Sequence, residues 1–201
     1  MPIRPRIQLV VEDELSEAVL RKLIEYSGRE FAIHGVLRMG GFGQIKSRIQ
    51  QFKNASNVIP HIVLTDLDQY ACAPKLLFDW GANTLTPALL FRVAVREVEA
   101  WLLADRNGIA EYLTIPLTKI PLRPENEADP KRTLINLARR SRKKRLVEEI
   151  VPVTGSRNSI GPFYNVRMGE FVRNIWSIPR ALENSGQLDR TLNRISLFML
   201  A

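Results

Sequence analysis

Two separate apolar runs of this chain end in acidic residues. The run 7–11 leads into Glu12, and the run 59–65 leads into Asp66 and Asp68. Short β-branched runs closed by polar residues are typical of buried strands in a parallel sheet. In open parallel sheets, chemistry takes place outside the carboxyl ends of the strands. We therefore expect Glu12, Asp66 and Asp68 to lie in one crevice, although they are far apart in sequence.

Carboxylates crowded in this way repel one another unless a cation or a proton lies between them. Because residues two positions apart on a strand share a face, Asp66 and Asp68 can point to the same side. Hard oxygen ligands of this kind suit Mg²⁺ or Mn²⁺. The sequence therefore predicts a metal site in which Glu12, Asp66 and Asp68 are the catalytic ligands for phosphodiester chemistry. For Asp68 alone, a helix cap or a turn would be a sufficient interpretation.

The composition is that of an ordinary globular protein with an excess of positive charge. The 201 residues include 29 basic and 21 acidic side chains, which gives a net charge of +8. Such a charge favours a polyanionic partner such as DNA. A single cysteine excludes an internal disulfide framework and a cysteine-rich zinc site. The sequence has no apolar stretch of about 18 to 20 residues and no signal peptide, so we expect a cytoplasmic protein.

Basic residues gather at three places that could contact phosphates. The densest has six cations in seven residues, for which we favour a phosphate-binding or acidic-partner surface over a solvated helix: Arg139, Arg140, Arg142, Lys143, Lys144 and Arg145. A glycine loop at 40–43 precedes a predicted helix with Lys46 and Arg48, where a phosphate contact and a plain turn both stay open. Arg157, in a loop rich in Gly and Ser, is a further candidate.

Apolar periodicity predicts alternating strands and helices in the first half of the chain. Strands are expected at 7–11, 31–37, 59–65 and 88–95, and helices at 16–27, 45–52 and 72–80. This alternation predicts an α/β fold with a mostly parallel sheet and helices on both faces. Later helices are expected at 97–105, 109–113, 131–150, 168–176 and 188–198. We predict an α/β core over 1–114 and a helical extension packed on it over 115–201, with one single domain as the alternative.

The two acidic motifs, in segments 11–20 and 63–68, resemble the Toprim fold of type IA topoisomerases, DnaG primases and OLD (overcoming lysogenization defect) nucleases. In that family an apolar strand ends in Glu, a helix follows, and a later strand ends in Asp-x-Asp. Its nucleases usually have Gly directly after the Glu and an acidic residue four positions after it. Asp13 and Ser16 stand at these places here, and Glu17 is the candidate substitute.

The resemblance continues after the fourth predicted strand. Segment 95–105, and later parts of 161–190, are similar to small stand-alone Toprim-like bacterial proteins that are often encoded beside an ATPase. Either Glu97 or Glu99 could complete the acidic crevice. We favour Glu99 because it directly precedes the apolar segment 100–103.

The resemblance implies a Toprim-like fold and a metal-dependent nuclease acting on DNA, with a separate ATPase chain as partner in an antiviral defence system. It implies that Mg²⁺ or Mn²⁺ is held by carboxylates from this set: Glu12, Glu17, Asp66, Asp68 and Glu99. The alternative is a catalytically weak Toprim-like module that binds nucleic acid or a partner.

Segment 9–14 also resembles the opening of a response-regulator receiver domain. In receivers adjacent carboxylates bind Mg²⁺ and a later strand-end aspartate, here Asp66, is phosphorylated. Receivers also carry a lysine, commonly before proline, at the end of a fifth strand. No Lys-Pro pair occurs in this chain, so the receiver is the less favoured interpretation.

Overall fold

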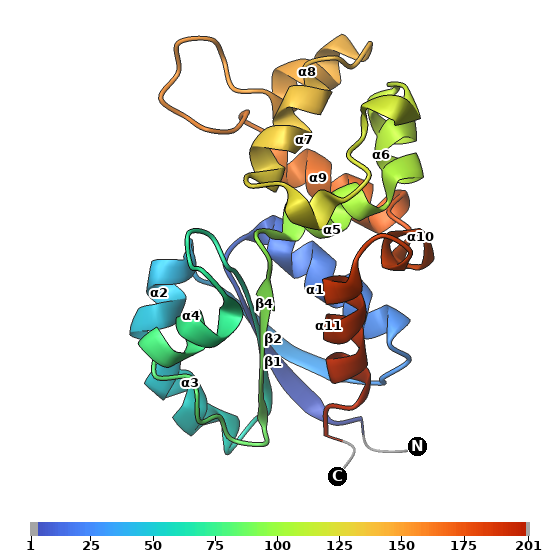
Figure 1. Ribbon diagram of the computed structural model, residues 1–201. Helices are drawn as coiled ribbons and strands as arrows, with labels where there is room; N and C mark the ends of the chain where they lie inside the picture. The colour runs from blue at the N-terminus through green and yellow to red at the C-terminus, as the bar shows by residue number, and fades with distance from the viewer. Residues whose placement is uncertain (1–3, 200–201) are drawn as a thin grey trace.

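The computed structural model describes residues 4–199, whose strands form one parallel sheet. The strands are β1 (Arg6–Val11), β2 (Ala32–Arg38), β3 (His61–Asp66) and β4 (Leu89–Ala94). Their order is β2-β1-β3-β4, and every neighbouring pair is parallel. The predicted α/β fold with a parallel sheet flanked by helices is confirmed. Because all strands run the same way, their carboxyl ends share one edge (Figure 1).

The two central strands, β1 and β3, separate two hydrophobic cores. Leu9 and Val11 belong to the core on one face, whereas Val10, between them, belongs to the core on the other. This is the two-residue alternation of strand side chains. β3 is buried along its whole length. The polar residues that end these strands are therefore held by a rigid, doubly covered scaffold.

Helices cover both faces, as expected. α2 (Phe42–Ser47), α3 (Ile49–Ser56) and α4 (Ala73–Asp79) lie on one face, and α1 (Glu14–Tyr26) and α11 (Gly186–Ser196) lie on the other (Figure 1). The prediction of one helix at 45–52 is wrong. Arg48 has φ −113° and ψ 10°, outside helical geometry, so it ends α2 and begins α3.

Between β4 and α11 the chain forms a helical layer past the carboxyl edge of the sheet (Figure 1). Its elements are α5 (Val98–Ala104), α6 (Arg106–Leu113), the short 3₁₀ turns η1 (Leu117–Lys119) and η2 (Pro124–Asn126), α7 (Pro130–Ala138), α8 (Lys144–Ile150), α9 (Tyr164–Asn174) and α10 (Ile178–Leu182). Buried residues of β1, α1 and this layer form one continuous core. The extension is thus packed on the sheet, and the division into 1–114 and 115–201 stays a prediction.

The helix predicted over 131–150 is wrong as a single element. α7 ends at Ala138, α8 begins at Lys144, and residues 139–143 form a turn between them. Successive cations would repel one another along one helix. The Ser141 hydroxyl also accepts a hydrogen bond from the Lys143 amide at 3.1 Å, which offers the backbone an alternative to helix. The basic run is therefore bent rather than laid along one face.

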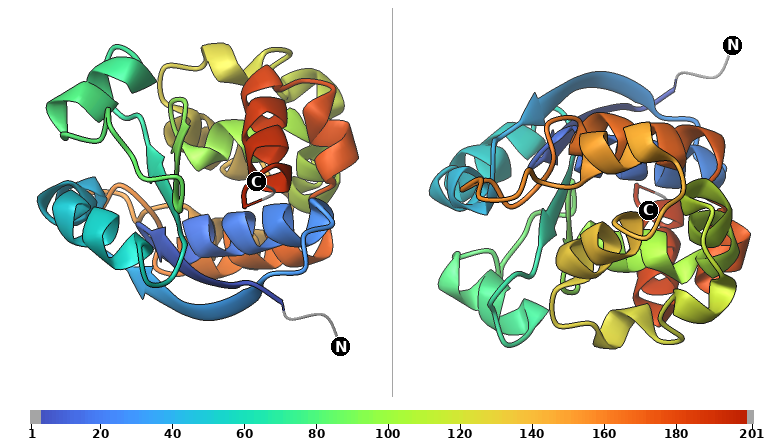
Figure 2. Two further views of the ribbon diagram at one scale, coloured as in Figure 1. Left: turned by 90° about the horizontal axis from the view of Figure 1, so that it is seen from below. Right: turned by 90° about the horizontal axis from the view of Figure 1, so that it is seen from above.

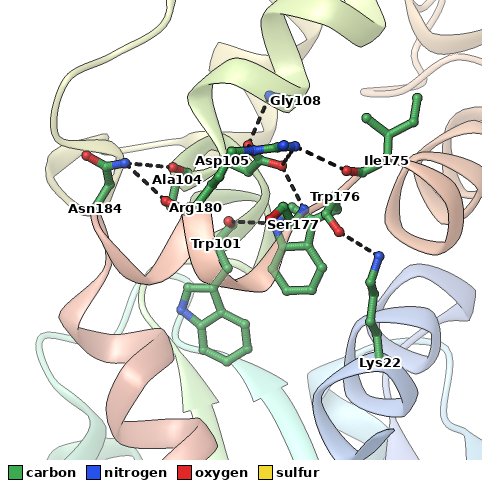
Figure 3. Close-up of polar contacts among 10 residues, drawn as sticks. All are labelled: Lys22, Trp101, Ala104, Asp105, Gly108, Ile175, Trp176, Ser177, Arg180 and Asn184. Atoms are coloured by element: carbon green, nitrogen blue, oxygen red, sulfur yellow. Dashed lines mark hydrogen bonds and ion pairs between the residues drawn. The ribbon is translucent and has the colours of Figure 1, made fainter. Parts of the chain in front are cut away.

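A buried carboxylate joins α5 and α6 to α10. Asp105 is 0% exposed and lies between α5 and α6. Its Oδ1 accepts from the Gly108 amide at 2.9 Å and from Arg180 Nε at 2.7 Å (Figure 3). Its Oδ2 accepts from the Ser177 amide at 2.7 Å and from Arg180 Nη2 at 2.9 Å. The Gly108 contact caps α6, whereas those from Ser177 and Arg180 fix α10 relative to α5.

The same region is attached to α1. Lys22 Nζ, on α1, donates to the Trp176 carbonyl at 2.6 Å, and Trp176 Nε1 donates to the Trp101 carbonyl at 3.2 Å (Figure 3). Burial lowers the pKa of Lys22. These bonds connect α1, α5 and the segment that follows α9, so the helical layer is fixed over the sheet edge.

Candidate acidic site at the carboxyl edge of the sheet

Glu12 and Asp66 are neighbours at the ends of the two central strands. Glu12 directly follows β1, and Asp66 is the last residue of β3. Glu12 Oε1 accepts from the Asp66 amide at 2.8 Å and from the Thr65 hydroxyl at 2.6 Å. The Gly40 amide donates to the Glu12 carbonyl at 2.8 Å, so the glycine loop after β2 lies against the same edge. The structure thus brings Glu12 and Asp66 together as the strand pattern predicts.

The buried side chain of Asp66, at the end of β3, contacts the first residue of α5. Its Oδ1 accepts from the Val98 amide at 2.9 Å, and the residue is 8% exposed. Burial raises the pKa of Asp66 well above its ordinary value, and the nearby carboxylates of Glu99 and Glu12 raise it further. Burial likewise raises the pKa of Glu12. The charged form of Asp66 is therefore unfavourable here unless a cation compensates it.

Glu99, in the first turn of α5, is 1% exposed. Its Oε1 accepts from the Tyr164 hydroxyl at 3.0 Å and lies 3.6 Å from Lys131 Nζ. Its Oε2 has no hydrogen-bond partner among residues 4–199. Burial raises the pKa of Glu99 to about 7, although Lys131 acts in the opposite direction. A buried carboxylate oxygen without a partner is a place where a cation or a proton is favoured.

Glu97 is engaged by the beginning of α7. Its Oε2 accepts from the Lys131 amide at 2.8 Å, and its Oε1 lies 3.4 Å from Lys131 Nζ. The Lys131 ammonium therefore lies between Glu97 and Glu99. Burial lowers the pKa of Lys131, but the carboxylates of Glu99, Glu97 and Asp66 outweigh this and raise it above its ordinary value. Glu97 and Glu99, the two residues that could complete the acidic crevice, thus both belong to this cluster. Glu99 has fewer protein partners than Glu97.

Asp68 lies at the rim of the same cluster. Burial raises its pKa, the positive charge of Lys131 lowers it, and the charge of Asp68 in turn raises the pKa of Glu12. Its backbone has φ 48°, a left-handed conformation that Asp adopts more readily than most residues. The Asp68 carbonyl accepts from Arg96 Nη1 at 3.0 Å, which holds the turn after β3.

Glu17 is directed away from these carboxylates. Its Oε1 accepts from Arg21 Nε at 2.7 Å, and its Oε2 accepts from Arg38 Nε at 2.5 Å. Although burial acts to raise it, these two arginines lower the pKa of Glu17. Asp13, where the Toprim nucleases usually have Gly, caps α1 by accepting from the Ser16 amide at 2.8 Å. The structure therefore does not bring Glu17 to Glu12 and Asp66.

The donor atoms suit a hard cation, but their side chains are turned toward protein donors. Within residues 4–199, no set of three or more His, Cys, Asp or Glu side chains is placed so that it could hold a metal ion. Glu12 Oε1 is directed to Thr65 and the Asp66 amide, and Asp66 Oδ1 to the Val98 amide. The all-oxygen donor set and the orphaned Glu99 oxygen nevertheless fit Mg²⁺ or Mn²⁺ in chemistry.

The predicted phosphate contacts do not form one surface. Arg139 lines a cavity beside Glu97, whereas Arg140 and Arg142 line a different cavity together with Glu111. Because the turn 139–143 separates α7 from α8, neighbouring cations of the run face different parts of the protein. The single basic face expected from the sequence is therefore replaced by two smaller ones.

Two cations of the run are exposed but form polar contacts with other residues of the protein. Lys143 Nζ donates to the Tyr112 carbonyl at 2.8 Å, and Arg145 Nε donates to Glu149 Oε1 at 3.0 Å. The remaining candidates are exposed as well: Lys144 on α8, Lys46 on α2, Arg48 between α2 and α3, and Arg157 in the connection between α8 and α9. That connection extends toward the α2 side of the sheet when seen from above (Figure 2).

Three residues that shape the acidic cluster were not predicted from the sequence: Thr65, Lys131 and Tyr164. Thr65 stands next to Asp66, so the strand end itself was a signal for it. Lys131 is the second residue of α7 and Tyr164 is the first of α9, and nothing local indicates that these helix starts meet the sheet edge. Comparing the chain with models of protein families, curated proteins and solved structures gave no match. Among residues 4–199, no helix is both long and apolar enough to cross a bilayer.

Proposed function

We propose that this protein is a divalent-metal-dependent nuclease of the Toprim type that cleaves DNA phosphodiesters. The observation that supports the proposal is the excess of buried carboxylate at the edge of the sheet. Asp66 and Glu99 are buried with raised pKa values, and Glu99 Oε2 has no partner among the described residues. Perturbed carboxylates gathered at the carboxyl edge of a parallel sheet are characteristic of functional sites.

In this proposal the carboxylates of the cluster bind the metal ion. Glu12, Asp66 and Asp68 would hold Mg²⁺ or Mn²⁺, with Glu99 as a further ligand. Such an ion supplies a water activated for attack and neutralises charge on the phosphodiester.

The surrounding protein donors keep these carboxylates oriented. The Thr65 hydroxyl holds Glu12, the Val98 amide holds Asp66, and the Tyr164 hydroxyl holds Glu99. Groups that hold a ligand in this way set its direction and basicity.

The proposal includes a separate ATPase chain as partner and a role in antiviral defence. It rests on the resemblance of segment 95–105 to Toprim-like proteins encoded beside an ATPase. The glycine loop at 40–43 lacks the Gly-Lys-Ser/Thr ending of an ATP-binding loop, so ATP hydrolysis would belong to the partner.

Lys131 favours a second candidate, a module that binds DNA or a partner without cleavage. Its ammonium already lies within 3.4 Å of Glu97 and 3.6 Å of Glu99. A built-in cation neutralises part of the charge that would attract Mg²⁺. The receiver interpretation gains nothing, because the described residues form four strands and leave no place for a lysine on a fifth.

The deciding experiment is plasmid cleavage with Mg²⁺ or Mn²⁺ by the parent protein and by Asp66→Asn. Asparagine keeps the shape of Asp66 and an oxygen for the Val98 amide, but it carries no charge. We expect cleavage by the parent and loss of cleavage in the variant. Asp189→Asn, which changes an exposed carboxylate on α11, is the matched control and should cleave like the parent.

Equal cleavage by Asp66→Asn and the parent would remove Asp66 from the reaction. Thermal denaturation with and without Mg²⁺ separates the two candidate functions. A ligand at 100 times its Kd stabilises the folded state by about 2.7 kcal/mol. If the parent shows neither cleavage nor stabilisation by the ion, alone or with the ATPase, the binding-module function is the correct one.

A further inference from the structure

A cavity of about 500 Å³ lies beside the acidic cluster, between α7 and the connection that leads from α8 to α9. Its lining includes Glu97 and Lys131 at the acidic cluster, Arg132 on α7, Arg139 directly after α7, and Asn158 and Ser159 from the connection. Lys131 therefore borders both the cavity and the carboxylates of the candidate site. A ligand in the cavity would lie next to that site.

The acidic residues of this cavity are already engaged by α7. Asp129 Oδ1 accepts from the Arg132 amide at 2.8 Å and caps the helix. Glu97 accepts from the Lys131 amide and lies within 3.4 Å of its ammonium. Both carboxylates line the cavity, and the beginning of the helix offsets part of their negative charge.

The two arginines, in contrast, are free to bind a ligand. Both Arg132 and Arg139 are exposed, and within residues 4–199 neither guanidinium forms an ion pair or a hydrogen bond. Arg132 lies on α7, and Arg139 directly follows its last residue with helical backbone angles. They are seven positions apart, which is about two helical turns or roughly 10 Å along one side. Duplex DNA carries one charge for about every 1.7 Å of its axis, so such a spacing can reach different phosphates.

We propose that this cavity binds the sugar-phosphate backbone of DNA and leads it to the acidic site. Arg132 on α7 and Arg139 just after it contact phosphates, and Asn158 and Ser159 supply polar groups from the connection between α8 and α9. The guanidinium fork suits two oxygens of a phosphate at once. The inference rests on the proposed function for its choice of DNA as the polyanion, and it excludes Arg140 and Arg142, which line another cavity.

The test measures binding of a short fluorescein-labelled duplex oligonucleotide by anisotropy, in EDTA, over a range of salt concentrations. Arg132→Gln combined with Arg139→Gln is the cavity variant. Arg140→Gln combined with Arg142→Gln is the matched control, because it removes the same charge from exposed positions nearby. We expect the cavity variant to lower the slope of log affinity against log salt by about 0.9 for each lost phosphate contact. The control should keep the slope of the parent.

Three outcomes would overturn the inference: an unchanged slope in the cavity variant, an equal decrease in the control, or no binding of the duplex by the parent. The circular dichroism of both variants, expected to match the parent, shows that the fold is kept. Because EDTA prevents metal-dependent cleavage, binding is measured independently of the proposed function. A parent that binds through the cavity but never cleaves would refute the nuclease and leave the DNA site standing.

Discussion

Two buried carboxylates at opposite ends of α5 have opposite surroundings. Asp105, after the last turn, is 0% exposed and accepts from two backbone amides and twice from Arg180 (Figure 3). Glu99, in the first turn, is 1% exposed. One of its oxygens accepts from Tyr164, the other has no partner among the described residues, and Asp66 lies nearby.

The difference distinguishes a carboxylate that holds the fold together from one that is available to a ligand. A buried charge contributes to stability only when its partner is close and its remaining lone pairs accept hydrogen bonds. Asp105 meets both conditions. The acidic cluster meets them only in part, because among the described residues Glu97 and Glu99 share the Lys131 ammonium, Glu99 Oε2 accepts no hydrogen bond, and Asp66 adds further negative charge. The cluster is therefore costly to the folded protein in the absence of a ligand.

The largest expected effect is the destabilisation caused by Asp105→Asn. The variant leaves the Arg180 guanidinium without its anion and directs an amide N–H toward donors that need an acceptor. We expect the free energy of unfolding to fall by about 3 to 5 kcal/mol, as when one partner of a buried ion pair is removed. Urea denaturation at neutral pH measures this loss.

The control for this prediction is the same substitution at an exposed site. Asp189→Asn should change the free energy of unfolding by no more than about 0.5 kcal/mol, as surface substitutions usually do. If Asp105→Asn were as mild as Asp189→Asn, the hydrogen bonds of Asp105 would not be holding α10 on α5. Asp105 would then not be a carboxylate that stabilises the fold.

The next effect is a pH dependence of stability that originates at Glu99. Its pKa is about 7 in the folded protein and about 4.5 when exposed, so the folded state binds a proton that the unfolded state has released. Stability from this source is fully present below pH 4.5 and is lost as the pH rises to about 7, by on the order of 3 kcal/mol. Lys131, Glu97 and Asp13 are the charged groups that act on this carboxyl group.

Glu99→Gln should remove most of this decrease between pH 5 and 7.5 in chemical denaturation. Some decrease should remain, because the pKa of Asp66 is raised by burial in the same direction. Glu148→Gln, at an exposed position of α8, is the control and should keep the pH profile of the parent. A Glu99→Gln profile parallel to that of the parent would show that Glu99 remains charged in the folded state.

The sheet could be predicted from the sequence because its information is local. β1, β3 and β4 are apolar runs closed by polar residues, and each lies within two residues of its predicted position. The helix predicted at 131–150 was wrong because apolar periodicity says nothing of the turn at 139–143, where cations and Ser141 interrupt the backbone. α10 was not predicted, since five residues that include a proline give too short a pattern.

The site was only partly predictable for the same reason. Glu12 and Asp66 are strand ends, and parallel strands place such residues together whatever follows. Lys131 reaches the cluster only because α7 begins over the sheet edge, which is tertiary information. Glu17 was chosen for its sequence distance from Glu12, but its side chain is bound by Arg21 and Arg38 instead.

The smallest expected effect on stability is that of Asp66→Asn, the same substitution that should be severe at Asp105. The new amide oxygen can still accept from the Val98 amide, while the charge that burial, Glu99 and Glu12 make unfavourable is removed. We expect the free energy of unfolding at pH 7.5 in EDTA to stay equal to that of the parent or to rise by about 1 kcal/mol. This rise is smaller than the free energy that corresponds to a pKa shift of one unit. Urea denaturation beside Asp105→Asn measures the contrast. A loss of several kcal/mol would mean that the ionised Asp66 supports the fold as Asp105 does, and the two ends of α5 would then not differ in kind.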